Sequence, residues 1–376
     1  MSKVLTMCKN RYVALRGFHT KRHLVVIESD DWGSIRMPSA DILRRLKQSG
    51  DHPENDPFLS YDCLENGEDL QRLFDVLNSV RDSNGSSAVI TANFATANPN
   101  FDAIDPEQGI YAYEPFYETY QRYGYGEDVL SLIRNAMRSR CFIPQLHCRE
   151  HLNVNRWMKE LQQKKKDVVI AFQNQIIGIN ASFSAENPFG YMDAFNSNFC
   201  TPPALKKIVC EALQIFEHAF LTKSKTFAAC CFVWDDALEE ILAENGIQGI
   251  QSGAWQLISS GTTTNKLRRK LHFTGECNRL GQVYTVRNCA YEPARLQNAA
   301  DSAEKCYRQI LDAFHNHKPA VINSHRVNYI GSISEHNAQE NLKGLVWLLK
   351  KAVKEIPDLE FVSTEDLLEI INQEKA

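Results

Sequence analysis

The chain has 376 residues, with 42 lysines and arginines against 46 aspartates and glutamates, a formal net charge of −4 and 43% hydrophobic residues. This composition is typical of a globular protein and excludes disorder as the main state. The nearly balanced charge gives no reason to expect nucleic acid or an anionic membrane as a partner. The longest apolar run, Phe227–Trp234, is far shorter than the roughly 20 residues of a membrane helix.

Two further features concern the cellular compartment. The first 22 residues are basic but lack the apolar stretch of a secretory signal, which predicts a cytoplasmic protein. The 11 cysteines are an odd number without a C-x-x-C pair, so neither a disulfide framework nor a cysteine zinc knuckle is expected. Cys230 and Cys231 are predicted to be small core residues.

Short apolar runs predict strands that alternate with helices. Strands are expected at Leu24–Glu28, Ala88–Asn93, Phe142–Leu146, Val168–Phe172, Phe227–Val233, Gly249–Gln251, Val283–Val286, Ala320–Asn323 and Glu360–Val362. Apolar residues at helical spacing predict core-facing helices within 205–219 and 342–356, the second with Trp347 in the core. A third helix, Ala237–Asn245, is opened by Asp236 and closed by Gly246.

Strands separated by helices predict an α/β fold with a parallel sheet, open or closed into a barrel. No Gly/Ser-rich or Pro-rich linker divides the sequence, and no repeat of fixed period occurs. We therefore expect one domain over 1–376, with long insertions at 33–86 and 97–141. In such a fold the functional groups lie where strands end and loops begin.

Three of the predicted strands end in side chains that can bind metal or move protons. The first runs into Asp30 and Asp31, the third into His147 and His151, and the eighth into His325. Taken singly, a turn or cap explains the aspartates, chance explains a His-x3-His pair, and a loop explains the late histidine. Because the carboxyl ends of parallel strands converge, we expect the three sets to meet.

The two imidazoles at i and i+4 would share a face on one helical turn, which is a chelating geometry. The pattern is not H-E-x-x-H, because position 148 is Cys, so the zinc-protease arrangement is excluded. One carboxylate and two imidazoles leave coordination positions open for water and substrate, as in catalytic rather than structural metal sites.

The order of these motifs resembles the polysaccharide deacetylase family, the NodB-like carbohydrate esterases. The family's strand end T-F-D-D-G is similar to Ile27–Gly33, and its late L-x-H motif is similar to Asn323–His325. Its H-[ST]-x-x-H motif is similar to His147–His151, with Cys148 where Ser or Thr is usual.

The resemblance implies a role for each matched residue. Asp30 would be the general base and His325 the general acid, while Asp31, His147 and His151 would bind a divalent metal, with zinc the expected ion. It also implies a distorted (β/α) barrel of the glycoside hydrolase and deacetylase type.

One family motif is missing from this chain. The third motif, R-x-P-Y, would follow the strand at 227–233, where the sequence has Phe232–Asp235 and no arginine. In the family this arginine orients the base. The arginines that could take its place are Arg36, Arg149, Arg287 and Arg326. The segment Arg287–Pro293 follows a strand and is a candidate wall of the pocket.

The expected activity is metal-dependent hydrolysis of an acetyl group from an acetylated sugar or glycan intermediate. Candidate substrate-binding residues in or beside the strand-end segments are Trp32, Trp234, Arg287 and Arg326. Two alternatives stay open: a metal-dependent glycoside hydrolase on a related barrel, and a non-catalytic glycan-binding relative, which the missing arginine would fit. A serine hydrolase and a nucleotide-binding enzyme are disfavoured, since their G-x-S-x-G and glycine-rich motifs do not occur.

Overall fold

A computed structural model describes residues 16–185, 187–259 and 267–375. Within these ranges nine parallel strands form one sheet in the order β10-β7-β6-β5-β2-β1-β12-β11, with β13 also paired to β1. The strands of this sheet are β1 (His23–Trp32), β2 (Ile90–Ala95), β5 (Phe142–Cys148), β6 (Thr226–Ala228), β7 (Gly249–Ser252), β10 (Val283–Val286), β11 (Cys289–Ala290), β12 (Ala320–His325) and β13 (Leu359–Phe361). Two antiparallel pairs stand apart, namely β3 (Ala97–Pro99) with β4 (Tyr113–Pro115), and β8 (Trp255–Ser259) with β9 (Leu267–Leu271).

The sheet curls round on itself because its two edge strands, β10 and β11, follow one another directly in the chain. Strand β10 pairs with β7, and strand β11 pairs with β12. Between them, the Arg287 amide donates to the Ser252 carbonyl and the Asn288 amide to the Val321 carbonyl. The expected distorted (β/α) barrel is confirmed. Arg287 lies in the connection between β10 and β11, and its side chain points into the barrel.

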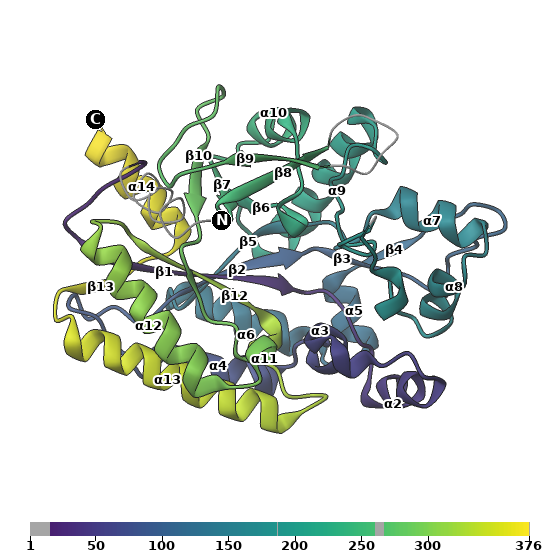
Figure 1. Cartoon of the computed structure of the whole chain (residues 1–376), viewed down its shortest axis with the longest axis horizontal. Helices are drawn as coiled ribbons and strands as arrows, with labels where there is room; N and C mark the ends of the chain where they lie inside the picture. The colour runs from purple at the N-terminus through teal and green to yellow at the C-terminus, as the bar shows by residue number, and fades with distance from the viewer. Residues whose placement is uncertain (1–15, 186, 260–266, 376) are drawn as a thin grey trace, which may run out of the picture.

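Helices surround the strands. They are α2 (Ala40–Ser49), α3 (Pro57–Tyr61), α4 (Gly67–Asn78), α5 (Phe116–Arg122), α6 (Gly126–Arg138), α7 (Val154–Gln162), α8 (Lys166–Gln173), α9 (Pro202–Phe220), α10 (Asp236–Glu244), α11 (Pro293–Leu296), α12 (Ala299–His315), α13 (Glu335–Glu355) and α14 (Thr364–Lys375). In Figure 1, α4, α6, α12 and α13 lie on one side of β1, and α9 and α10 lie on the other. Helices α2, α3, α7 and α8 gather beyond the carboxyl end of β1. No helix of the described residues is long and apolar enough to cross a membrane.

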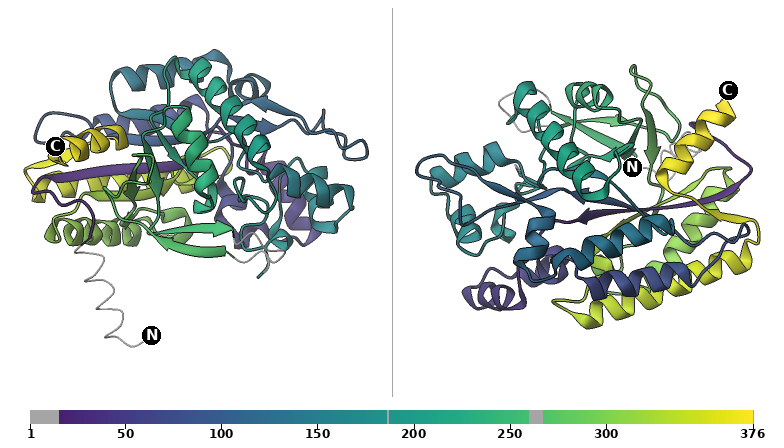
Figure 2. Two further views of the ribbon diagram at one scale, coloured as in Figure 1. Left: turned by 90° about the horizontal axis from the view of Figure 1, so that it is seen from above. Right: turned by 180° about the vertical axis from the view of Figure 1, so that it is seen from behind.

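Alternate residues of β1 face different surroundings, as the period of a strand requires. Val25 and Ile27 point outward into the main core, which they form with the surrounding helices. Leu24 and Val26 belong to a second apolar cluster, to which α14 contributes four residues. Both views of Figure 2 show this C-terminal helix, in yellow, beside the start of β1, in purple. Helix α14 therefore closes the amino end of the barrel.

Several sequence predictions needed correction. Val168–Phe172 belongs to α8, since Val168 and Ala171, three residues apart, form a buried helical face. The fifth predicted strand stops at Ala228, and a 3-10 turn at Cys230–Phe232 follows. The other predicted strands and helices are present with shifted ends, and the cap of α10 is Asp235 rather than Asp236.

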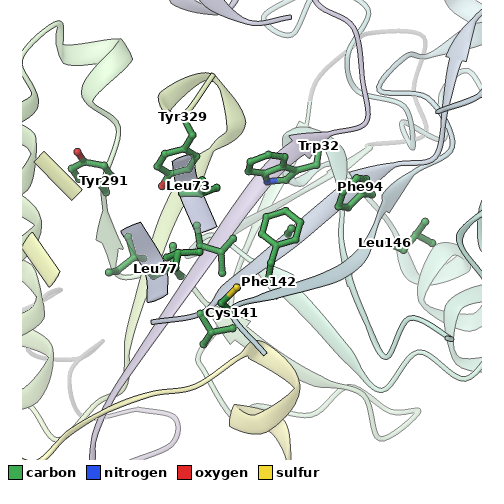
Figure 3. Close-up of a cluster of buried hydrophobic side chains, with 14 of the residues drawn as sticks. Trp32, Leu73, Leu77, Phe94, Cys141, Phe142, Leu146, Tyr291 and Tyr329 are labelled. Atoms are coloured by element: carbon green, nitrogen blue, oxygen red, sulfur yellow. The ribbon is translucent and has the colours of Figure 1, made fainter. Parts of the chain in front are cut away.

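The tryptophan assignments also changed. Trp347 is 42% exposed on α13 and lies beside the ammonium of Lys351, so it is not a core residue. Trp32, an expected substrate-binding residue, is 1% exposed and packs edge-on against Phe142 and nearly parallel to Tyr329. Figure 3 shows these rings together with Phe94 in one buried cluster. Trp32 therefore packs the core and offers no ring face to a substrate.

Because Trp32 is buried and Trp347 is exposed, replacing each with alanine should have a different effect on stability. Trp32→Ala removes a fully buried ring and should lower the free energy of unfolding by about 3–5 kcal/mol. Trp347→Ala, the matched control at an exposed position, should cost about 1 kcal/mol or less. Denaturant unfolding followed by circular dichroism measures both, and equal losses would contradict the placement of Trp32 in the core.

Candidate active site

A β-bulge in β1 places two adjacent carboxylates at the mouth of the barrel. The register with β2 gains one extra residue between Ser29 and Trp32, and Asp31 has the left-handed backbone angle φ 76°. In a bulge two residues face one on the partner strand, so the strict alternation of side chains is broken. Non-glycine residues rarely adopt such an angle, and those that do cluster at functional sites.

Asp30 is held from several directions. Two guanidinium nitrogens of Arg287 donate to its two carboxylate oxygens, each at 2.7 Å, and Asn93 Nδ2 donates to Oδ1 at 2.7 Å. Burial raises the pKa of Asp30, but the charge and hydrogen bonds of Arg287 outweigh burial and leave that pKa below its usual range. Asp30 is therefore ionised and fixed in orientation.

Of the four arginines considered as substitutes for the missing third motif, Arg287 is the one that donates to Asp30. Its Nε donates to Glu28 at 2.7 Å, so the guanidinium bridges two buried carboxylates. The other candidates have different partners: Arg36 pairs with Asp31, Arg149 with Glu150 and Glu211, and Arg326 with Asp62 and Glu65. Because its donors are committed inside the barrel, Arg287 orients the Asp30 carboxylate rather than binding substrate.

Asp31, His147 and His151 come together as predicted, although not on a helical turn. His147 lies in β5, and the chain turns sharply before α7 begins at Val154. Asp31 Oδ1 is 3.7 Å from His147 Nε2 and 3.4 Å from His151 Nε2, and all three side chains are almost fully buried. The ring centroids of the two histidines are 4.9 Å apart.

The orientation of His147 and the neutral ring of His151 suit a cation between them. His147 Nδ1 donates to the Ala228 carbonyl at 2.7 Å, which directs Nε2 toward Asp31. Asp31 Oδ1, His147 Nε2 and His151 Nδ1 are buried with no hydrogen-bond partner in the part of the chain described. Burial and the charge of Arg36 lower the pKa of His151 to about 3, so that its ring is neutral.

These donor atoms fit a divalent metal. Ligands held tetrahedrally at about 2.0–2.1 Å lie roughly 3.3 Å from one another, close to the two distances from Asp31 Oδ1. Buried polar atoms without partners are costly, and a cation at this position would satisfy Asp31 Oδ1 and His147 Nε2. On His151, the nitrogen that faces Asp31 is Nε2, whereas the unpartnered one is Nδ1. A fourth donor was missed in the sequence: Cys230, expected only as core, has its Sγ within 4.8 Å of a ring nitrogen of both His147 and His151.

His325 lies across the site from this group. It is the register partner of Asp30 in neighbouring strands, and its Nε2 is 4.0 Å from Asp30 Oδ2. Its Nδ1 donates to Glu292 Oε1 at 2.5 Å, and Asn323 and Asn328 also donate to the Glu292 carboxylate. With 19% of its side chain exposed, His325 is the most accessible of the five predicted catalytic and metal residues.

Glu292 sets the charge of this histidine. Burial lowers the pKa of His325, but the Glu292 carboxylate raises it to about 8 on balance. The ring is therefore protonated at neutral pH. Glu292 lies in the segment Arg287–Pro293, which the sequence predicted to be a pocket wall. Its effect on the pKa of His325 could be recognised only from the contact between the two side chains in the structure.

Two other expected substrate contacts are structural. Trp234 is 1% exposed, and its indole nitrogen donates to Glu239 at 3.0 Å. Arg326 is fully buried, with Nε donating to Asp62 at 3.0 Å and Nη1 to Glu65 at 2.7 Å. Both are therefore removed from the set of substrate-binding candidates.

A buried ion network stands behind Asp31. Arg36 lies between Asp31, at 3.3 Å, and Asp62, at 3.9 Å, and Asp62 in turn pairs with Arg326. Burial raises the pKa of Asp62 to about 7, against the opposing charge of Arg326. This buried network, comprising Asp31, Arg36, Asp62, Glu65 and Arg326, fixes the orientation of the Asp31 carboxylate from the side away from the histidines.

The first test of the site is metal content. His147→Ala and His151→Ala should each lose most of the near-stoichiometric divalent metal expected in the wild type, since each removes a donor. His315→Ala, an exposed histidine on α12, is the control and should keep it. Elemental analysis of proteins with folded circular dichroism spectra gives the result, and full metal in both site variants would overturn the assignment.

The second test separates the adjacent aspartates. Asp31→Asn should lose both metal and turnover, whereas Asp30→Asn should keep metal and lose turnover, because Asp30 is engaged by Arg287 and Asn93 rather than by the histidines. Metal analysis and rate assays are made on the same preparations. The reverse pattern would exchange the two roles.

No protein-family model and no curated protein matches the sequence. Among solved structures, the chain is similar to a Mycobacterium smegmatis protein described as a polysaccharide deacetylase, with 11% identity, 96% of this chain and 94% of that chain covered, and a TM-score of 0.44. It is also similar to Puue allantoinase (8% identity, 94% and 93% covered, TM-score 0.47) and to a Bacillus anthracis pseudoenzyme of the CE4 family (8% identity, 93% and 66% covered, TM-score 0.42). Structural neighbours thus include polysaccharide deacetylases, the family that the motifs resemble.

Proposed function

We propose that the protein is a metal-dependent hydrolase that removes an acetyl group from an acetylated sugar or glycan intermediate, with zinc as its metal. One observation carries the proposal. Asp31 and His147 present buried donor atoms without partners, His151 Nε2 lies 3.4 Å from Asp31 Oδ1, and an ionised carboxylate and a protonated histidine flank the group at one barrel mouth. This is the set of groups that metal-assisted acyl hydrolysis needs.

Asp31, His147 and His151 would hold the ion, which when bound polarises the acetyl carbonyl and acidifies water. Asp30 then accepts the proton of the attacking water. Because Arg287 lowers the pKa of Asp30, this carboxylate is a weak base, so it depends on a water that has already been acidified. Its fixed orientation compensates in part, since a positioned base needs no reorganisation.

His325 would protonate the departing amine or alcohol. Departure of such a group is difficult without a proton, and a histidine that is protonated near pH 7 can supply one. Glu292 holds the ring by Nδ1, which leaves Nε2 on the side of Asp30 and the site. His325, the most accessible of the five site residues, would thus donate the proton to the leaving group.

The rival functions are separated by product. A deacetylase releases acetate from acetylated sugars, whereas a glycoside hydrolase releases reducing sugar. The case for a non-catalytic relative was the missing arginine, and the contacts of Arg287 with Asp30 remove that reason. Acetate release from a panel of N- and O-acetylated sugars by the metal-loaded protein tests the proposal, and a loaded protein that releases none would overturn it.

The role of His325 predicts a dependence on leaving group. His325→Ala should keep metal and lose roughly 100-fold or more in kcat on unactivated substrates, the scale of general acid catalysis. An activated acetyl ester, whose leaving group departs without a proton, should be much less affected. Equal losses on both substrates would show that His325 is not the proton donor.

The Glu292 contact predicts a shift in the pH–rate profile. The acid works only while protonated, so the rate should fall as pH rises through about 8. Glu292→Gln removes the anion that raises the pKa of His325 and should move this alkaline limb to lower pH. Glu360→Gln, at the opposite end of the barrel, is the control and should leave it in place. An unmoved limb in Glu292→Gln would contradict the role of Glu292.

A further inference from the structure

Cys230 lies where chain geometry directs it at the candidate metal centre. Strand β6 ends at Ala228, whose carbonyl holds His147, and Cys230 begins the turn two residues later. The cysteine is fully buried. The same short segment therefore approaches His147 twice, through the Ala228 carbonyl and through the Cys230 thiol.

The thiol belongs to a compact group of donors. Its Sγ and one ring nitrogen each of His147 and His151 lie within 4.8 Å of one another, and two of the site's unpartnered atoms are ring nitrogens of these histidines. Ligands on zinc are closer than this, so binding would draw the side chains together. Asp31 Oδ1 approaches the same histidines at 3.4 and 3.7 Å.

We propose that Cys230 binds the metal as a thiolate, so that the centre is a mixed nitrogen, oxygen and sulfur site. The proposal rests on the proposed function only in requiring that the centre takes up a divalent ion. On binding, the S–H bond breaks, the proton goes to solvent, and a metal–sulfur bond forms with no change in oxidation state.

A sulfur ligand changes which metals the centre accepts. Thiolate favours zinc over magnesium, calcium and manganese, which prefer oxygen. Zinc can also expand from four to five ligands, so Cys230 need not exclude the water that hydrolysis requires.

Cobalt is the probe for the test. Co²⁺ added to metal-free wild-type protein should produce an intense near-ultraviolet thiolate-to-cobalt charge-transfer band that saturates at one equivalent. Cys230→Ser should still bind cobalt through the remaining donors, with affinity weaker by at least about 10–100-fold, and without the band. The matched controls are Cys231→Ser, the adjacent cysteine, and Cys148→Ser, the buried cysteine beside His147; both should keep the band.

The outcomes are decisive in either direction. Cobalt bound without the band in wild type would overturn the proposal, and so would a band that persists in Cys230→Ser. If Cys230→Ser fails to fold, X-ray absorption of the zinc-loaded wild type decides: sulfur at about 2.3 Å supports Cys230, and only nitrogen and oxygen near 2.0–2.1 Å contradicts it. Metal bound without sulfur leaves the proposed hydrolase intact, whereas sulfur-bound metal without acetate release contradicts the hydrolase alone.

Discussion

A single buried guanidinium allows the barrel to hold two carboxylates in its interior. Arg287 contacts Glu28 and both oxygens of Asp30 at 2.7 Å, and all three side chains are at most 7% exposed. A buried carboxylate without its partner is destabilising by several kcal/mol, so the interior could not be acidic without this arginine. The arginine reaches it because it lies in the connection between β10 and β11 that closes the barrel. The connection that closes the sheet therefore also carries the residue that keeps Asp30 ionised.

The polarity of the interior follows from the period of β1. Leu24 and Val26 face the apolar plug formed by α14, and Glu28 and Asp30 continue the same parity toward the mouth. Had the alternation held, Asp31 would face the outer core. The bulge at its left-handed backbone turns it inward instead, and Trp32 resumes the outer position among aromatic rings. The bulge thus lets two consecutive side chains, those of Asp30 and Asp31, face the barrel mouth where regular alternation would allow only one.

The sequence predicted the convergence of the strand ends because that depends only on parallel strands, which periodicity reveals. Asp31, His147 and His151 meet, and His325 lies beside Asp30. Contacts made across the barrel were not predictable in this way. Glu292 lies about 30 residues from His325 in the chain, and choosing Arg287 among four arginines requires knowing which strand closes the barrel.

The errors have local physical causes. Val168–Phe172 is short and apolar, a pattern that a buried helix and a strand share, so periodicity could not separate them. Trp32 was placed at the site because it follows two functional aspartates, but the bulge moves it to the opposite face. Cys230 was assigned to the core from its apolar neighbours; it is buried, as expected, and its proximity to two histidines depends on a turn that the sequence does not mark.

Adjacent identical residues can have different chemical roles when their surroundings differ, and Asp30 and Asp31 illustrate this. Both oxygens of Asp30 accept short hydrogen bonds from Arg287, and Asn93 adds another. Asp31 accepts one longer contact from Arg36 at Oδ2 and leaves Oδ1 without a partner, facing two imidazoles. A carboxylate saturated by donors has little capacity to bind a cation, whereas one with a free oxygen that faces two imidazoles can take one up. The hydrogen bonds to each carboxylate therefore support the proposed division between base and metal ligand, independently of any resemblance to other proteins.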